Sequence, residues 1–175
     1  SLNGINTESY ANNTPGKYLK IVAKLISGGL YSPFFLVHHG GFDHHSNQLT
    51  QQNSLLERLS TSIFVFAKYL HNHGVEQDVL IMTTSEFGRR TYENGAQGTD
   101  HGGSAPHILV GANINSGIYG GDPDLENLIN GDNLMHSIDY RQMYATIIKE
   151  WFGHSDDVVQ SVFNENYDTL GIINQ

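Results

Sequence analysis

The sequence predicts an α/β fold, with an open sheet and helices on its faces. Short, continuous apolar runs alternate along the chain with segments whose apolar residues recur every three or four positions. The first pattern is typical of buried strands and the second of amphipathic helices. Polar, glycine-containing loops separate these segments. The resulting order of strand, helix, strand, loop, strand and helix is typical of an open sheet covered by helices.

Proline and glycine mark the ends of the predicted helices. Pro15 stands at the start of the first helix, and glycines at 28 and 74 follow the first and second helices. The second helix has the clearest apolar spacing, and Asp139 precedes the third. The predicted helices cover residues 15–27, 49–71, 139–151 and a short segment after Ser155.

Three apolar runs predict short strands at residues 33–37, 78–84 and 106–110. Each run passes into a polar or glycine-containing loop. In open α/β sheets, ligands bind outside the carboxyl ends of the strands. We therefore expect functional residues in the loops that begin at His38 and Ser85.

Composition limits the possible functions. The chain has 175 residues, enough for one compact domain or part of a larger one. Its 18 acidic and 9 basic residues give a net charge of −9, which argues against a nucleic-acid partner. It has no cysteines and no apolar stretch of membrane-spanning length, so thiolate metal sites and a membrane span are not expected. Its 10 histidines outnumber lysine and arginine together, and histidine binds metals readily.

The loop after the first predicted strand has the densest group of metal-ligand residue types. Gly40 and Gly41 allow the backbone to turn, so that Asp43 and His45 can present an oxygen and a nitrogen to one cation. The alternative is a solvated loop whose histidines bond to the backbone. The candidate ligands are His38, His39, Asp43, His44 and His45.

Two further segments carry polar residues suited to a site. In GTDHGG, at 98–103, the glycines permit the non-helical conformation that lets Asp100 and His101 face one cation. The alternative there is an Asx-type turn. In SEFGRR, at 85–90, Glu86 is a candidate ligand or base, and Arg89 or Arg90 can form a planar fork on a phosphate or sulfate oxyanion. A surface turn with a Glu–Arg ion pair is the alternative.

Four blocks of the sequence are GGFDHHSNQ (40–48), SEFGRRTYEN (85–94), GTDHGG (98–103) and IDYRQMYATIIKEWFG (138–153). Together they resemble the C-terminal half of a bacterial protein family, DUF1501, within the alkaline phosphatase-like and sulfatase-like superfamily. The resemblance covers about residues 17–153. It implies an open three-layer α/β/α sandwich, of which residues 1–175 form the C-terminal part, with flanking segments at 1–14 and 155–175.

The resemblance implies hydrolysis of a small phosphate or sulfate ester with one or two divalent metal ions, usually zinc. Asp43 and His45 are similar to the Asp-and-His metal motif of the superfamily. Glu86 stands where an aspartate ligand is found, and His101 resembles the last histidine ligand. Two other residues have expected roles: Asp100 as a further metal ligand, and Arg89 as the catalytic residue that stabilises developing charge.

The chain also departs from the superfamily pattern. Phe87 stands where a ligand histidine is found, and no serine or threonine matches the nucleophile motif, which belongs to the N-terminal half. We therefore expect that half to be missing and the isolated chain to be inactive. Family members tend to carry an export leader, so the resemblance implies a periplasmic or extracellular protein, with a cytoplasmic one as the alternative.

Two functional hypotheses follow. In the first, the chain is the metal-binding half of a phosphate- or sulfate-ester hydrolase. In the second, it is a non-catalytic interaction or structural module that retains the fold. Phe87 and the absence of a nucleophile motif favour the second hypothesis for the isolated chain, and the candidate ligands favour the first for the complete protein.

Overall fold

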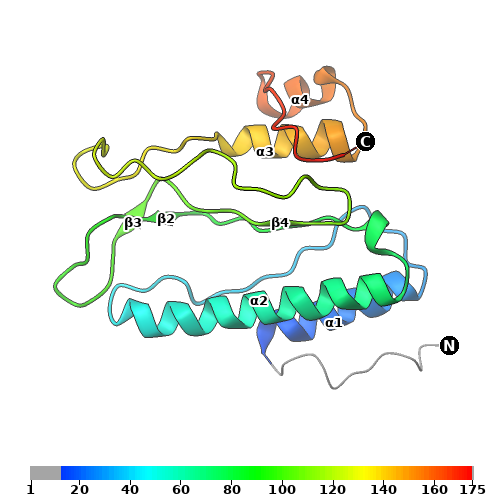
Figure 1. Cartoon of the computed structure of the whole chain (residues 1–175), viewed down its shortest axis with the longest axis horizontal. Coiled ribbons are helices and arrows are strands. Elements are labelled where there is room, and N and C mark those ends of the chain that lie inside the picture. The colour runs from blue at the N-terminus through cyan, green and yellow to red at the C-terminus, as the bar shows by residue number, and fades with distance from the viewer. Residues whose placement is uncertain (1–12, 175) are drawn as a thin grey trace. The chain divides into compact units, whose positions relative to one another are not determined.

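The computed structural model describes residues 13–174, which form helices and pairs of very short strands (Figure 1). Most of the predicted flanking segment 1–14 therefore lies outside the described residues. The chain divides into two compact units. The first unit comprises Ser1–Leu80 and Tyr92–Asp100, and the second comprises Ile81–Thr91 and His101–Gln175. None of the helices within residues 13–174 is both long enough and apolar enough to cross a membrane.

Two helices form the core of the first unit. They are α1 (Thr14–Ser27) and α2 (Gln48–Asn72), and they pack against each other (Figure 1). The side chain of Asn13 caps α1 by accepting a hydrogen bond from the Gly16 N–H at 3.0 Å. Both predicted helices are confirmed. Their buried apolar side chains are Leu19, Val22 and Ala23 from α1, and Phe66, Tyr69 and Leu70 from α2.

The predicted buried strand at 33–37 is wrong. These residues form no strand, and the side chains of Phe34 and Leu36 are 72% and 92% exposed. A continuous apolar run becomes a buried strand only when another strand bonds to it and other elements cover it. No strand within residues 13–174 pairs with this run.

Strands of the second unit pair two by two. Strand β1 (Ile81–Met82) is antiparallel to β4 (Leu109–Val110), and β2 (Gly88–Arg89) is antiparallel to β3 (His101–Gly102). The predicted strands at 78–84 and 106–110 thus exist, but only two residues of each enter a ladder. Two-stranded pairs neither require nor exclude a larger sheet, so the three-layer sandwich stays a prediction.

Helices at the C-terminal end complete the second unit. Helix α3 (Tyr140–Thr146) continues into a π-helical turn, η2 (Ile147–Trp151), and α4 (Asp156–Phe163) follows (Figure 1). These confirm the helices predicted after Asp139 and Ser155. Beyond α4 the chain returns to pair Ile173 with Ile114, and Ile172 and Ile173 are buried.

A capping box begins α3. The Asp139 side chain accepts a hydrogen bond from the Arg141 N–H at 2.8 Å, and the Gln142 side chain accepts one from the Asp139 N–H at 3.2 Å. The Arg141 guanidinium also donates two hydrogen bonds to the Asp139 carboxylate, at 2.9 and 2.6 Å. These hydrogen bonds lower the pKa of Asp139 from 3.8 to about 2.

Removing the Asp139 carboxylate is expected to destabilise the second unit. At pH 7, Asp139→Ala should lower the free energy of unfolding by about 1–2 kcal/mol, the usual cost of deleting an N-cap. Because folding depresses the pKa of Asp139, its stabilisation is complete above about pH 4 and is lost as the pH falls toward 2. Urea unfolding followed by the fluorescence of Trp151, the single tryptophan, measures the difference.

The control for this prediction is Asp139→Asn, which keeps a capping side chain and removes the charge. It should retain the stabilisation that comes from the cap and lose only the pH-dependent part. A difference between wild type and Asp139→Ala that is the same at pH 7 and pH 2 would contradict the role assigned to the Asp139 charge.

Candidate functional site

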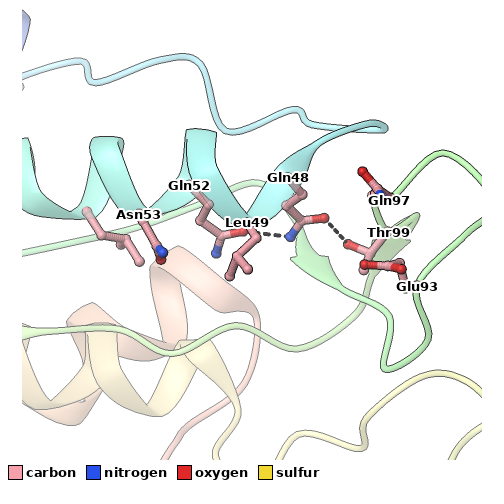
Figure 2. A pocket seen from close by; sticks show the side chains of 9 residues that line it. Gln48, Leu49, Gln52, Asn53, Glu93, Gln97 and Thr99 are labelled. Atoms are coloured by element: carbon pink, nitrogen blue, oxygen red, sulfur yellow. Dashed lines mark hydrogen bonds between the residues drawn. The ribbon is translucent and has the colours of Figure 1, made fainter.

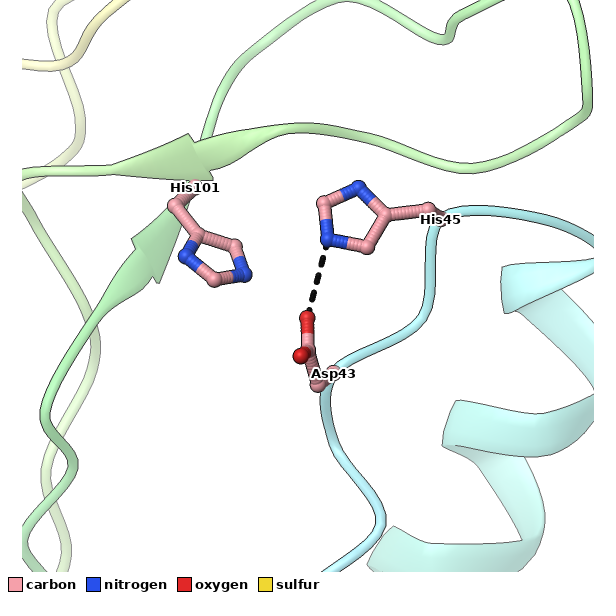
Figure 3. A group of neighbouring side chains, drawn as sticks. All are labelled: Asp43, His45 and His101. Carbon is pink, nitrogen blue, oxygen red and sulfur yellow. Dashed lines mark ion pairs between the residues drawn. The ribbon is translucent and has the colours of Figure 1, made fainter.

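In the first unit, one histidine lies between two carboxylates. His45 Nε2 is 2.9 Å from Asp43 Oδ1, and His45 Nδ1 is 3.6 Å from Asp100 Oδ1. Figure 3 shows His45 and Asp43, both on the loop that precedes α2, joined by the shorter ion pair. The three side chains are 52%, 63% and 61% exposed for His45, Asp43 and Asp100, so solvent and small ligands reach them.

A second loop holds the backbone of His45 in place. The Asn94 side chain donates a hydrogen bond from Nδ2 to the His45 carbonyl at 3.1 Å. Its Oδ1 accepts hydrogen bonds from the N–H groups of Ala96 and Gly98, at 2.9 and 3.1 Å, which is an Asx-type turn. Gly98 lies so close to the His45 carbonyl that no side chain fits between them. The cluster of Asp43, His45 and Asp100 is therefore built on two interlocked backbone segments.

The donor atoms of this cluster are of the chemical types that bind a divalent metal. Zn–O and Zn–N bonds are about 2.0–2.2 Å, so neighbouring tetrahedral ligands lie roughly 3.4 Å apart. Asp43 Oδ1 and His45 Nε2 are 2.9 Å apart, the distance of a direct ion pair, so a zinc ion bound by both would move them about 0.5 Å further apart. An imidazole gives only one ring nitrogen to a given ion, and a carboxylate commonly holds the other nitrogen. Asp100 stands beside that other nitrogen.

One neighbouring histidine, His39, has a local role. A ring nitrogen of His39 lies 3.1 Å from the Leu55 carbonyl, and the His39 ring meets the Phe42 ring edge to face at 5.1 Å. His39 thus follows the alternative interpretation, in which loop histidines bond to the backbone. Among the described residues of the first unit, His45 lies between two carboxylates, whereas His39 does not.

In the second unit, β2 and β3 place three of the residues singled out in the sequence on one face. Arg89 and His101 are directly opposite each other in the ladder, so their side chains share a face. The Phe87 ring stacks on the His101 ring, with centroids 3.8 Å apart and planes 4° from parallel. The Arg89 guanidinium lies 5.2 Å from the centroid of the Phe87 ring. Stacking covers a face of the imidazole, whereas its nitrogen lone pairs lie in the ring plane, so His101 keeps its capacity as a ligand.

The two arginines that the sequence left as alternatives differ in their contacts. Arg90 forms an ion pair with Asp132 and donates from Nε to the His101 carbonyl at 3.1 Å. It is therefore a structural residue of the second unit. Arg89 stays the residue that the sequence predicts for an oxyanion. Glu86, just before Phe87, is exposed.

Comparison with known families decides the family. A family model described as a protein of unknown function, DUF1501, matches residues 24–163. The chain belongs to the DUF1501 family. No curated protein and no solved structure matches it significantly. The DUF1501 part of the sequence resemblance is confirmed, whereas membership of the alkaline phosphatase-like superfamily stays a prediction.

The DUF1501 chain also contains a pocket that the sequence motifs did not indicate. Its volume is about 310 Å³, and it lies between the start of α2 and residues 93–99 of the first unit (Figure 2). The run QLTQQN at 48–53 is the sequence feature that could have indicated this pocket, because it places several amide side chains within about one and a half turns of a helix. The lining residues are Gln48, Leu49, Gln52, Asn53, Leu56, Glu93, Gln97, Gly98 and Thr99.

Proposed function

We propose that this chain is the metal-binding part of a hydrolase that acts on phosphate or sulfate esters, and that the metal is divalent, with zinc as the first candidate. The observation that carries the proposal is the position of His45 between Asp43 and Asp100, on loops that are open to solvent. An imidazole nitrogen with a carboxylate oxygen beside it is a donor pair that zinc accepts.

The three residues of the cluster have different proposed roles. Asp43 and His45 Nε2 are the metal ligands. Asp100, whose Oδ1 lies 3.6 Å from His45 Nδ1, is the proposed partner of that nitrogen. A hydrogen bond formed on closer approach would set the tautomer of the imidazole and the direction of its ligating nitrogen. The bound metal would supply Lewis-acid chemistry, by polarising an ester oxygen and by lowering the pKa of an attacking group. Glu86 and His101 stay predicted ligands on the strength of the sequence resemblance.

Arg89 is the proposed catalytic residue. Its backbone is paired with His101 in the β2–β3 ladder, and its guanidinium lies 5.2 Å from the centroid of the Phe87 ring. A planar guanidinium can form two parallel hydrogen bonds to the oxygens of a phosphate or sulfate group. Arg89 would therefore bind the negative charge of the ester and of its transition state.

A non-catalytic module is the alternative function, and Phe87 is the observation that favours it. The superfamily resemblance places a ligand histidine at this position, and a phenyl ring cannot bind a metal. Phe87 instead packs flat on His101. A chain that kept its loops and lost a ligand could retain the fold as an interaction or structural module.

Zinc binding is expected to depend on His45. The metal-free 175-residue protein, titrated with zinc in a calorimeter, should take up the metal at a fixed stoichiometry, and His45→Ala and Asp43→Ala should abolish this uptake. Asp100→Asn should weaken binding about 10- to 100-fold, the usual effect of losing a partner of a ligand histidine. His101→Ala in the same titration tests the prediction made from the sequence.

The matched control is His71→Ala. His71 is also exposed and lies 3.2 Å from a carboxylate, that of Glu76, but belongs to the far end of α2. Zinc uptake should not change in this variant. If the wild type takes up no zinc, or if His71→Ala lowers uptake as much as His45→Ala, the proposed metal site is wrong.

Turnover distinguishes the hydrolase from the module. Aryl phosphate and aryl sulfate are the test substrates, and the protein to assay is its longest natural form. Hydrolysis that disappears in Asp43→Ala and Arg89→Ala supports the hydrolase. Stoichiometric zinc binding without hydrolysis of either substrate supports the module.

A further inference from the structure

The pocket beside α2 differs in chemistry from the metal cluster. Its polar lining consists of amides, one hydroxyl and one carboxylate, and it contains no lysine or arginine. A phosphate or sulfate group would meet no positive side chain there, and it would meet Glu93. The lack of a basic side chain and the presence of Glu93 make the pocket better suited to an uncharged ligand than to an anion.

Amide and hydroxyl groups suit a ligand that carries many hydroxyls. Asparagine and glutamine each offer donors and acceptors, and a sugar hydroxyl needs both. Leu49 and Leu56 add apolar surface to the same pocket, against which the C–H faces of a sugar ring can pack. The volume of about 310 Å³ is at the lower end of the roughly 300–1,000 Å³ of small-molecule sites, which suits one ring.

A chain of hydrogen bonds orients the amides in advance. The Thr99 hydroxyl donates to Gln48 Oε1 at 2.7 Å, and Gln48 Nε2 donates to Gln52 Oε1 at 2.6 Å (Figure 2). This arrangement uses the oxygen of Gln52, so the group that Gln52 offers to a ligand is its NH₂. Side chains that are already held in place lose little conformational entropy on binding.

The pocket and the metal cluster share their backbone. Thr99 immediately precedes Asp100, and Gln48 follows His45 by three residues. The Gln48 N–H donates to the Gln97 carbonyl at 2.8 Å, so the start of α2 is bonded to the loop on the other side of the pocket. A group bound in the pocket would thus lie next to the residues proposed to hold the metal.

We infer that the pocket binds a saccharide ring, and that the esters on which the protein acts are sugar esters. The second part of this inference rests on the proposed function. The first part does not, because the pocket contains none of the proposed metal ligands and would bind an uncharged sugar without metal.

Sugar binding is tested by nuclear magnetic resonance on the ¹⁵N-labelled, metal-free 175-residue protein. The probes are glucose, galactose and N-acetylglucosamine, added to about 50 mM because a single ring in an open site is expected to bind with a Kd of about 1 mM or weaker. At least one sugar should give saturable shifts of the Gln48, Gln52 and Thr99 amides. Gln52→Leu should weaken this binding about tenfold or more through loss of its donors.

Two further variants control for folding. Gln77→Leu replaces an exposed glutamine of the 3₁₀ turn η1 (Glu76–Asp78) in the same unit, and sugar binding should not change. Asn53→Leu replaces an exposed residue of the pocket, where loss of the fold is not expected, and it should also weaken binding. No saturable shift with any of the three sugars, or equal weakening by Gln77→Leu, would overturn the saccharide site.

The link to the ester is tested separately. With zinc bound, glucose 6-sulfate should bind more tightly than glucose, and His45→Ala should remove this advantage. Equal affinity for the two would overturn the assignment of sugar esters as substrates. Failure of zinc uptake with intact sugar binding would instead reject the proposed function and leave the saccharide site standing.

Discussion

Gly98→Ala is expected to disrupt both the packing of the first unit and the candidate metal cluster. An added Cβ at Gly98 would lie well inside van der Waals contact with the carbonyl group of His45, and 2.6 Å from the Ser46 nitrogen. These are backbone atoms, which cannot move aside as the end of a side chain can. The loop at 93–99 and the loop before α2 would have to separate, and with them Asp100 and His45.

We expect Gly98→Ala to lower the free energy of unfolding by about 2–3 kcal/mol, the range for forcing extra volume into packed structure. Zinc uptake should fall with it, because His45 loses the backbone contact that positions it. Urea unfolding followed by far-ultraviolet circular dichroism reports the stability, since α1 and α2 give much of that signal. Calorimetric titration with zinc reports the second effect.

Gly95→Ala is the matched control. Gly95 belongs to the same loop, but an added Cβ there meets no atom within 4 Å. Stability and zinc binding should therefore stay within about 0.5 kcal/mol of wild type, as for most surface substitutions. Equal effects of the two alanines would show that close packing at Gly98 does not hold the cluster.

Gly88→Ala should have the largest effect on the stability of the second unit. A Cβ at Gly88 would overlap the Ser104 carbonyl and lie 3.1 Å from the Ala105 nitrogen. Gly88 is buried in β2, opposite Gly102 of β3, so the backbone has no free side toward which to move. We expect a loss of about 3 kcal/mol or more, since the clash involves backbone on a paired strand.

Trp151 fluorescence during urea unfolding measures this loss within the second unit. Gly103→Ala is the control, because Gly103 follows β3 directly and an added Cβ there meets nothing within 4 Å. It should be close to neutral. A Gly88→Ala protein as stable as the Gly103→Ala protein would contradict the packing between β2 and residues 104–105.

The helices could be predicted from the sequence because their determinants are local. Apolar spacing placed the second helix at 49–71, and the structure has α2 at Gln48–Asn72. Pro15 and Asp139 identified the starts of α1 and α3 through the same capping and first-turn chemistry that the structure shows. Each signal acts within a few residues of the element that it defines.

Strand prediction failed where it depended on partners. The runs at 33–37 and 78–84 look alike in sequence, yet only the second contains a strand. A strand is stabilised by a neighbour that can be far away in the chain, as β1 is by β4. Apolar composition therefore identifies segments that could pair, but it does not say which of them do.

The candidate site shows the same division. Asp43 and His45 are two residues apart on a glycine-containing loop, and this short spacing was enough to pair them in a prediction. The approach of Asp100 to His45 spans 55 positions, so only the fold brings them together. The sequence also left Arg89 and Arg90 as alternatives, and the structure adds that Arg90 forms an ion pair with Asp132.

The sequence by itself determined the helices, the DUF1501 family and the chemical types of the candidate residues. The spacing of apolar residues, the helix caps and the motifs each involve only a short stretch of chain. The tertiary structure alone decided which strands pair, that Asp100 lies 3.6 Å from the second nitrogen of His45, and that an amide-lined pocket lies nearby. These features depend on close approach between distant segments. Gly98 permits one such approach because it has no side chain. The sequence does not predict this role, since the backbone of His45 comes next to Gly98 only in the folded chain.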